Sequence, residues 1–189
     1  YPDVKASWPG PHIGKPSRSR PVNMDDPLPP GQISRTTFPR FGMPPFARRF
    51  PTTLDRVDIR ITGAVRQPMT LGPDLADVSR SQNVSDFHCV TTWSVRGLRW
   101  EGIRFCDLFD DILVPQAGAP PDADLIVFRG QDGYRAALPL ADLRAPDVLL
   151  ADRLDGQPLS VAHGAPIRLV APAHYGYKSV KHHREIRVV

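Results

Sequence analysis

Proline is unevenly distributed along this chain, and its distribution limits where regular structure can form. Twelve of the 22 prolines lie in residues 1–51. Proline fixes φ and has no backbone N–H, so it interrupts helices and central strands. We therefore expect residues 1–50 to form an extended N-terminal arm and residues 51–189 to form one folded domain. Four apolar side chains late in the arm are unusual for a plain linker, namely Phe38, Phe41, Met43 and Phe46.

Beyond the arm, the pattern of apolar residues predicts short strands and short helices. Val57, Ile59 and Ile61 alternate with polar residues, which is the period of a half-buried strand. Residues 105–113 place Phe and Leu at helical spacing. Further strands are expected at 87–90, 125–128, 134–138, 148–154, 167–170 and 185–189, and a helical turn at 140–143. Strands and helices do not alternate in a βαβ rhythm, so the predicted class is α+β.

Composition is ordinary for a soluble globular protein, with 41% hydrophobic and 23% charged residues. No apolar run approaches the roughly 20 residues that a membrane-spanning helix needs. No signal-peptide pattern is visible, and we expect a cytoplasmic protein, although the chain starts at Tyr1 without an initiator Met. Two cysteines, Cys89 and Cys106, do not make a disulfide framework.

The net charge of +4 conceals basic ends around an acidic middle. Residues 1–60 carry ten Lys or Arg against five Asp or Glu, and residues 166–189 carry five against one. Such ends suit a nucleic-acid partner, and they equally suit an anionic cofactor held between them. The charge distribution alone is compatible with a nucleic-acid partner and with an anionic cofactor.

The most chemically informative stretch is residues 86–102, which holds Cys89 and two of the three tryptophans. A thiol at the end of a strand can reach a pocket, where its thiolate acts as a nucleophile or as a ligand for a soft metal. A free cysteine is also often a small buried hydrophobe, and spacing alone favours that interpretation. Cys106 lies beside the apolar stripe of the predicted helix and is interpreted as a packing residue.

Three ordered segments resemble one known family. Phe87-His88-Cys89-Val90, continued by Trp93-Ser94 and Arg99-Trp100-Glu101-Gly102, resembles the metal-ligand segment of the sulfite-oxidase-like molybdenum oxidoreductases. Residues 155–172 and residues 175–181 resemble the family's next block and its pterin-binding block. Residues 38–45 loosely resemble the segment that enters the family's cofactor pocket. The resemblance implies a mixed-sheet molybdopterin-binding domain.

The resemblance also implies a cofactor and a set of site residues. Molybdenum would be bound by the Cys89 thiolate and by two sulfurs of a pyranopterin, giving a molybdenum–molybdopterin centre. Cys89 is therefore the expected metal ligand, and Cys89, His88 and Arg40 are the expected catalytic residues. His88 is interpreted equally well as a core histidine. The expected cofactor-binding residues are Phe41, Gly42, His163, Arg168, Tyr177, Lys178, Ser179, Val180 and Lys181.

The expected reaction is a two-electron oxygen-atom transfer on a small-molecule substrate. Val90, Thr91 and Thr92 follow the cysteine where sulfite oxidases carry residues that help bind sulfite. The run is more similar to the bacterial branch that contains methionine-sulfoxide reductase catalytic subunits, so reduction of an S-oxide or N-oxide is expected. Sulfite oxidation at the same site is the alternative, with Arg96 and Arg99 as further cations near the substrate. No haem-binding pattern is visible, so a separate electron-transfer partner is expected.

Three rival interpretations remain. A nucleic-acid-binding module would use the basic ends and aromatics such as Tyr175 and Tyr177. A zinc protein would use Cys89 with nearby histidines, but no Cys-x-x-Cys or His-x-x-x-His spacing supports it. A folded relative that never binds the cofactor is the third. Our prediction is the molybdenum enzyme, with no nucleic-acid partner.

Overall fold

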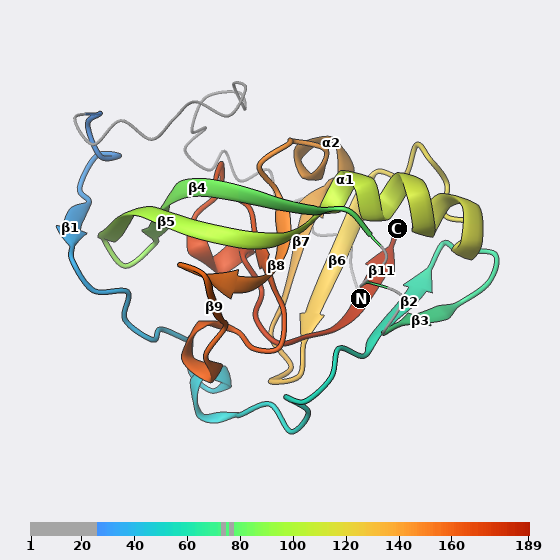
Figure 1. Cartoon of the computed structure of the whole chain (residues 1–189), viewed down its shortest axis with the longest axis horizontal. Coiled ribbons are helices and arrows are strands. Elements are labelled where there is room, and N and C mark those ends of the chain that lie inside the picture. The colour runs from blue at the N-terminus through green and yellow to red at the C-terminus, as the bar shows by residue number, and fades with distance from the viewer. Residues whose placement is uncertain (1–25, 73–74, 76–77) are drawn as a thin grey trace, which may run out of the picture.

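The computed structural model describes residues 26–72, 75 and 78–189. Two mixed β-sheets and a few short helices make up this part of the chain (Figure 1), as the α+β prediction requires. The first 25 residues of the expected arm lie outside the described residues. In the remainder of the arm, strand β1 covers Ile33–Arg35 and a short 3-10 helix, η1, covers Phe46–Arg48.

The larger sheet is built around a long hairpin. Strand β4 (Arg80–Cys89) pairs antiparallel with β5 (Trp93–Arg104), and β5 also pairs with β1 and with β8 (Leu149–Leu154). Strands β9 (Gln157–Pro158) and β10 (Arg168–Val170) complete this sheet by pairing with β8. The twisted hairpin forms one side of the molecule (Figure 1).

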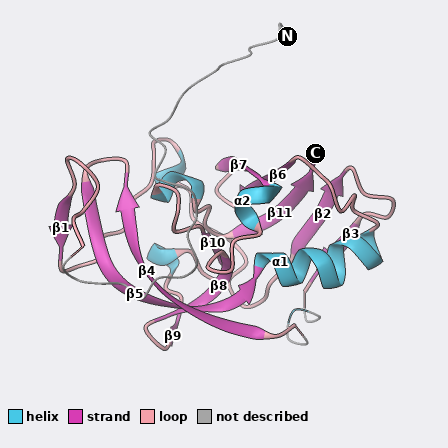
Figure 2. Ribbon diagram, turned by 90° about the horizontal axis from the view of Figure 1, so that it is seen from above, coloured by secondary structure: helices cyan, strands magenta, loops and turns pink. Residues whose placement is uncertain are grey.

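The smaller sheet has the strand order β3-β2-β11-β6-β7. Its members are β2 (Ile59–Gly63), β3 (Met69–Leu71), β6 (Leu125–Gly130), β7 (Arg135–Pro139) and β11 (His183–Val188). Helix α1 (Phe105–Leu108) continues as the π-helical segment η3 (Phe109–Ala117), and helix α2 covers Leu140–Leu143. Figure 2 shows α1 and its continuation beside β2 and β3, away from the tip of the β4–β5 hairpin.

Two hydrophobic clusters follow from this arrangement. The first joins the inner faces of both sheets to α1 and η3 through fully buried side chains such as Phe105, Phe128 and Ile186. The second lies against the hairpin and contains Cys89, with the two tryptophans Trp93 and Trp100. The thiol therefore belongs to the smaller core, which is separate from the larger one.

One local feature differs from what its residue types suggest. A pair such as Arg96–Gly97 is typical of a turn, but it lies inside β5. Gly97 adopts a φ of 64° near a register shift in the β4–β5 pair, and its N–H donates to the Asp86 carboxylate at 2.9 Å. This is a β-bulge, which uses the same glycine chemistry as a turn. The true turn is residues 90–92, with Thr92 at a φ of 69°.

Candidate functional site

A cavity lies where the arm crosses the end of the β4–β5 hairpin. Its walls come from residues 38–43, 46, 47 and 49 of the arm, residues 87, 89, 90 and 93 around the hairpin turn, and residues 176, 177 and 179–182 before β11. His163, Arg168, Asp132 and Tyr134 also contribute. The empty volume is about 880 Å³, which includes open solvent at the mouth. Ten of the twelve site residues predicted from the sequence line it, and the two exceptions are His88 and Lys178.

The thiol of Cys89 lies at one end of the cavity. Cys89 is the last residue of β4, its side chain is almost fully buried, and its sulfur is free and 3.1 Å from the Thr91 hydroxyl. Its carbonyl accepts hydrogen bonds from the Thr92 N–H and the Gln32 side-chain amide, both at 3.1 Å. Two independent donors thus fix the backbone that carries the sulfur.

Aromatic rings surround this thiol end. Phe38 packs on Phe87 with ring centroids 4.9 Å apart, and Phe87 stacks on Trp93 at 6.2 Å. Phe41 meets Trp93 edge-on at 6.5 Å. Gly176 makes room for this wall, because a Cβ there would lie 2.3 Å from the ring of Phe87. The wall next to the thiol is therefore apolar and closely packed.

A second part of the cavity, which we call the cationic end, contains Arg168 and Lys181, and Arg168 is the more buried of the two. Its side chain is fully buried, and its guanidinium donates to the carbonyls of Leu169, His163 and Ser179 at 2.9–3.2 Å. The guanidinium also lies over the rings of Phe87 and Trp100 at 5.3 and 5.1 Å. Burial lowers the pKa of Arg168 to about 9. No described carboxylate pairs with it, so its positive charge has no protein counter-ion in this part of the chain.

Lys181 and His163 connect the cavity to the arm. The Lys181 ammonium donates to the carbonyls of Phe41 and Ala162 at 2.9 and 2.8 Å. His163 donates from Nε2 to the Phe38 carbonyl at 3.0 Å, and its ring stacks on Phe38 at 4.6 Å. Burial first, and then repulsion by Arg168 and Arg40, lower the pKa of Lys181 to about 7.

The remaining predicted residues of the cavity wall contact other parts of the protein through both backbone and side chain. Ser179 accepts a hydrogen bond from the Ala171 N–H on its hydroxyl, and its carbonyl holds Arg168. Val180 is buried, and its carbonyl accepts from the Leu169 N–H. Tyr177 is partly exposed at the rim, and Gly42 packs closely against Ala47. Arg40 donates to the Ala47 carbonyl at 2.9 Å and lies over the Phe50 ring at 4.2 Å.

The two predicted residues outside the cavity lining have other contacts. His88 lies 2.7 Å from the Ser94 hydroxyl, and burial lowers the pKa of its imidazole. Adjacent residues of a strand point to opposite faces, so His88 faces away from the side on which Cys89 lies. Lys178 donates to the Ala137 carbonyl at 2.7 Å on the far side of η5 (Gly176–Lys178). The predicted catalytic role of His88 thus has no geometric support.

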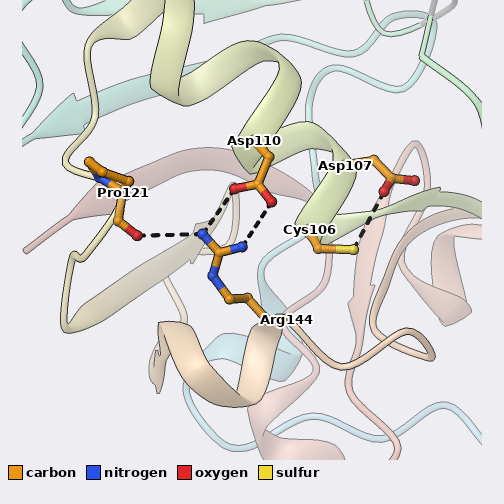
Figure 3. A network of polar contacts seen from close by, with 5 residues as sticks. All are labelled: Cys106, Asp107, Asp110, Pro121 and Arg144. Carbon is orange, nitrogen blue, oxygen red and sulfur yellow. Dashed lines mark hydrogen bonds and ion pairs between the residues drawn. The ribbon is translucent and has the colours of Figure 1, made fainter. Parts of the chain in front are cut away.

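The second cysteine belongs to a different environment. Cys106 lies on α1 next to Asp107, with its sulfur 3.5 Å from the carboxylate, and close to the Arg144–Asp110 ion pair (Figure 3). Burial and the neighbouring Asp107 raise the pKa of the Cys106 thiol. It does not line the cavity. A neutral, half-buried thiol is a packing residue, as its place beside the helical stripe suggests.

Two kinds of feature are absent from the described residues. No cluster of three or more His, Cys, Asp or Glu side chains suited to a metal ion occurs in residues 26–72, 75 and 78–189. The zinc interpretation therefore lacks a ligand set there. No helix in the same residues is long and apolar enough to cross a membrane.

The residues of the cavity fit a molybdopterin. A pyranopterin carries a phosphate, and Arg168 uses three of its five N–H groups on protein carbonyls, which leaves two without a partner among the described residues. Lys181 supplies a second cation on the same side. The free Cys89 sulfur in the same cavity offers the soft ligand that molybdenum needs. The arrangement suits a ligand that carries both a metal and an anionic group.

Several cavity residues were missed by the sequence analysis. Asp132 and Tyr134 come from the turn between β6 and β7, and His182 directly follows the predicted pterin block. Nothing in the sequence marks Asp132 or Tyr134, because a Gln-Asp-Gly turn is common in hairpins. His182 was readable only as a neighbour of Lys181.

Comparisons with known proteins agree with this geometry. Residues 47–189 match the family model of the oxidoreductase molybdopterin binding domain. The chain is 32% identical to the oxidoreductase YuiH of Bacillus subtilis over 90% of this chain and 83% of that protein. It is 30% identical to the protein-methionine-sulfoxide reductase catalytic subunit MsrP of Xanthomonas campestris over 69% of this chain.

Other relatives share only part of their length with this chain. The chain spans 44% of that MsrP protein and 16% of the mitochondrial sulfite oxidase of Drosophila melanogaster, which is 36% identical over 96 residues. Among solved structures, the sulfane dehydrogenase SoxCD from Paracoccus pantotrophus superposes with a TM-score of 0.58 over 70% of this chain and 38% of its own. At 22% identity this likeness concerns the fold alone. The cavity, the family model and the length of the match to YuiH lead to one conclusion: the chain belongs to the oxidoreductase molybdopterin-binding domain family.

Proposed function

We propose that this molybdopterin-dependent oxidoreductase reduces a neutral S-oxide or N-oxide. The observation that carries the proposal is the apolar wall around the Cys89 sulfur, which consists of Phe38, Phe41, Phe87 and Trp93. Such a wall removes water from a neutral substrate at lower free-energy cost than from a dianion such as sulfite. The name of the MsrP relatives, protein-methionine-sulfoxide reductase, supports the same substrate class.

The positions of the arginines also support a neutral substrate. Arg40, Arg96 and Arg99 were the cations expected near the substrate. Arg96 donates to the Asp26 carbonyl at 2.7 Å, and neither Arg96 nor Arg99 lines the cavity. Arg40 does line it, with its guanidinium on the Ala47 carbonyl and over the Phe50 ring. Only one of the three expected arginines therefore lies at the cavity, which gives a sulfite dianion fewer cations than expected.

Different residues of the site would hold the metal, the cofactor and the substrate. When bound, the molybdenum cofactor supplies two-electron oxygen-atom exchange with the substrate. Cys89 would hold the metal, with its backbone fixed by Gln32 and Thr92. Arg168 and Lys181 would hold the anionic end of the cofactor. Phe41 and Trp93 would orient the substrate and exclude water. Electrons would come from a separate redox partner.

Steady-state assays of one loaded sample test this proposal. The protein is produced in a host that makes molybdopterin, and its molybdenum content is measured by mass spectrometry. Methionine sulfoxide is offered with a reduced viologen dye, and sulfite is offered with ferricyanide. We expect a higher kcat/KM for the sulfoxide, with no turnover by the Cys89→Ser variant. A higher kcat/KM for sulfite would reject the substrate class and leave the family assignment intact.

A further inference from the structure

His182 is a cavity residue to which neither the sequence motifs nor the proposed mechanism gives a role. It follows Lys181 directly, its side chain is buried, and it lines the cavity. Its neighbour His183 is also buried, but it packs against Phe128 in the larger core and does not line the cavity. Two adjacent histidines thus lie in two unlike environments.

The backbone of His182 is unusual and firmly held. Its φ is 54°, in the left-handed region that residues other than glycine seldom adopt. Its N–H donates to the Gly164 carbonyl at 3.2 Å, and its carbonyl accepts from the Gln131 N–H at 2.8 Å. A strained residue persists where the surrounding structure fixes it, and such residues cluster at ligand sites. These bonds hold the imidazole in one position at the cavity wall.

The hydrogen bond of the ring determines its tautomer. Nδ1 lies 2.6 Å from the Ala165 carbonyl, and a carbonyl can only accept, so the proton is on Nδ1. Burial lowers the pKa of His182; the hydrogen bond to Ala165 and the charge of Asp132 oppose this effect, and the charges of Lys181 and Arg168 add to it. In the neutral ring Nε2 carries a lone pair. No hydrogen bond to Nε2 occurs among the described residues, yet Nε2 is not one of their fully buried, unpaired atoms. Nε2 is therefore accessible, and His182 lines the cavity.

An exposed acceptor at this position complements the rest of the cavity. Arg168, Lys181 and Arg40 offer only N–H donors. A pterin ring carries N–H groups as well as acceptors, and these three cations cannot accept from its N–H groups. The cavity also holds the Asp132 carboxylate, but one of its oxygens already accepts from the Tyr134 N–H at 2.9 Å. We propose that Nε2 of His182 accepts a hydrogen bond from a ring N–H of the bound pyranopterin, which makes His182 a cofactor-binding residue.

Two substitutions at the same position separate the proposed contact from the structural one. His182→Asn keeps an amide donor near the place of Nδ1, and Asn tolerates a left-handed backbone, but it has nothing at the place of Nε2. His182→Gln places an acceptor near Nε2 and loses the donor to Ala165. His183→Leu is the matched control, since it removes the neighbouring imidazole from the core without touching the cavity.

The readout is retention of the pterin and does not require turnover. Loaded proteins are incubated at pH 7 and passed through a desalting column at intervals. The pterin that remains is then oxidised to its fluorescent form and quantified, together with molybdenum. We expect the dissociation rate to rise about 2- to 12-fold in His182→Asn, as loss of one neutral hydrogen bond predicts. His182→Gln should recover part of this loss, and His183→Leu should match the parent.

The melting temperatures of the cofactor-free proteins show whether a substitution destabilises the fold itself. We expect empty His182→Asn to melt within a few degrees of the parent, so that its faster release reports the cofactor contact. The inference is overturned if His182→Asn retains pterin like the parent, or if His182→Asn and His183→Leu lose it equally. Absence of pterin from the loaded parent would overturn the inference together with the cofactor assignment. The substrate proposal is judged separately, by the assays with methionine sulfoxide and sulfite.

Discussion

The two ends of the cavity are built on opposite principles. At the thiol end, aromatic rings surround Cys89. Hydrogen bonds from Gln32 and Thr92 fix its backbone, and its sulfur contacts the Thr91 hydroxyl and forms no disulfide. At the cationic end, Arg168 and Lys181 are held by main-chain carbonyls and have no carboxylate partner among the described residues. Carbonyl dipoles position a cation without neutralising it. The cationic end therefore keeps a net charge for an anion, whereas the thiol end presents a soft atom in an apolar setting.

The two ends also differ in their relation to the chain. The thiol end comes largely from one hairpin, since Phe87, Cys89 and Trp93 lie within seven residues of each other. The cationic end draws on β10, on the segment between η5 and β11, and on the arm, which is far from the other two in the sequence. Phe38 and Phe41 belong to both, because their rings cover the thiol end and their carbonyls accept from His163 and Lys181. The arm thus links the metal end to the anion end.

The largest expected effect is at the thiol end. Cys89→Ser replaces a soft thiolate by a hard oxygen, and we expect molybdenum content to fall at least about 100-fold, since even changes beyond the ligand sphere cost 10- to 100-fold. Cys106→Ser should keep full molybdenum and activity, because its thiol lies outside the cavity. Mass spectrometry of both purified variants checks this, and equal loss in the two would reject Cys89 as the ligand.

The next largest effect is at the cationic end. Arg168→Met keeps the apolar stem but removes a charge-assisted contact worth about 1.5–3 kcal/mol. The dissociation constant of the pterin should therefore rise about 10- to 150-fold. Arg129→Met is the control, because Arg129 is an exposed residue of β6 that pairs loosely with Glu185. Retention equal to the parent in Arg168→Met would mean that the anionic group binds elsewhere.

A positive charge introduced at the thiol end should make it more like the cationic end and shift its substrate preference toward sulfite. Val90 is half exposed at the cavity rim, and Val84 is similarly exposed on the same hairpin but outside the cavity. Val90→Arg adds a cation near the substrate, which should raise the ratio of sulfite oxidation to sulfoxide reduction roughly tenfold, the effect of about 1.4 kcal/mol. Val84→Arg should leave the ratio unchanged. An equal change in both variants would show that overall charge, and not the rim, sets the preference.

The smallest expected effect is a pH dependence of the empty protein. The pKa of Lys181 is lowered to about 7, well below its value of about 10.5 in the unfolded chain. Between these values the unfolded chain binds more protons, so stability should rise with pH across this window by less than about 1.4 kcal/mol per pH unit. Lys181→Met should flatten the rise, and the part that remains should come from Arg168 and Lys178, whose pKa values are also lowered.

Denaturant unfolding of the empty parent and of Lys181→Met, at intervals from pH 7 to 10, measures this difference. Parallel pH profiles for the two proteins would show that Lys181 keeps its charge on folding. Bound cofactor supplies a counter-ion and should reduce the dependence in the parent.

The chemistry of the site was largely predictable from the sequence, because its residues stand in short contiguous runs. Cys89 at a strand end, the block that contains Arg168 and the run Ser179, Val180 and Lys181 all line one cavity. Local patterns also predicted β2, β6, β7, β8, β10, β11 and the helix after β5, since period and burial agree there. They did not predict β3 or β5, and they found only the end of β4. The assignment of His88 lacked support because side chains alternate along a strand, which places neighbours on opposite faces.

Only the tertiary structure decided what surrounds each of these residues. The sequence marks Arg168 as a basic residue, but whether it is exposed, paired with a carboxylate or enclosed by carbonyls depends on contacts with Ser179 and His163. The same holds for His182, whose tautomer is set by Ala165, and for the arm, whose rings complete the wall around Cys89. The sequence by itself determined the family and the reactive groups, because these reside in local order. Burial, pairing and charge state arise from segments that meet only on folding, so they were decided by the fold.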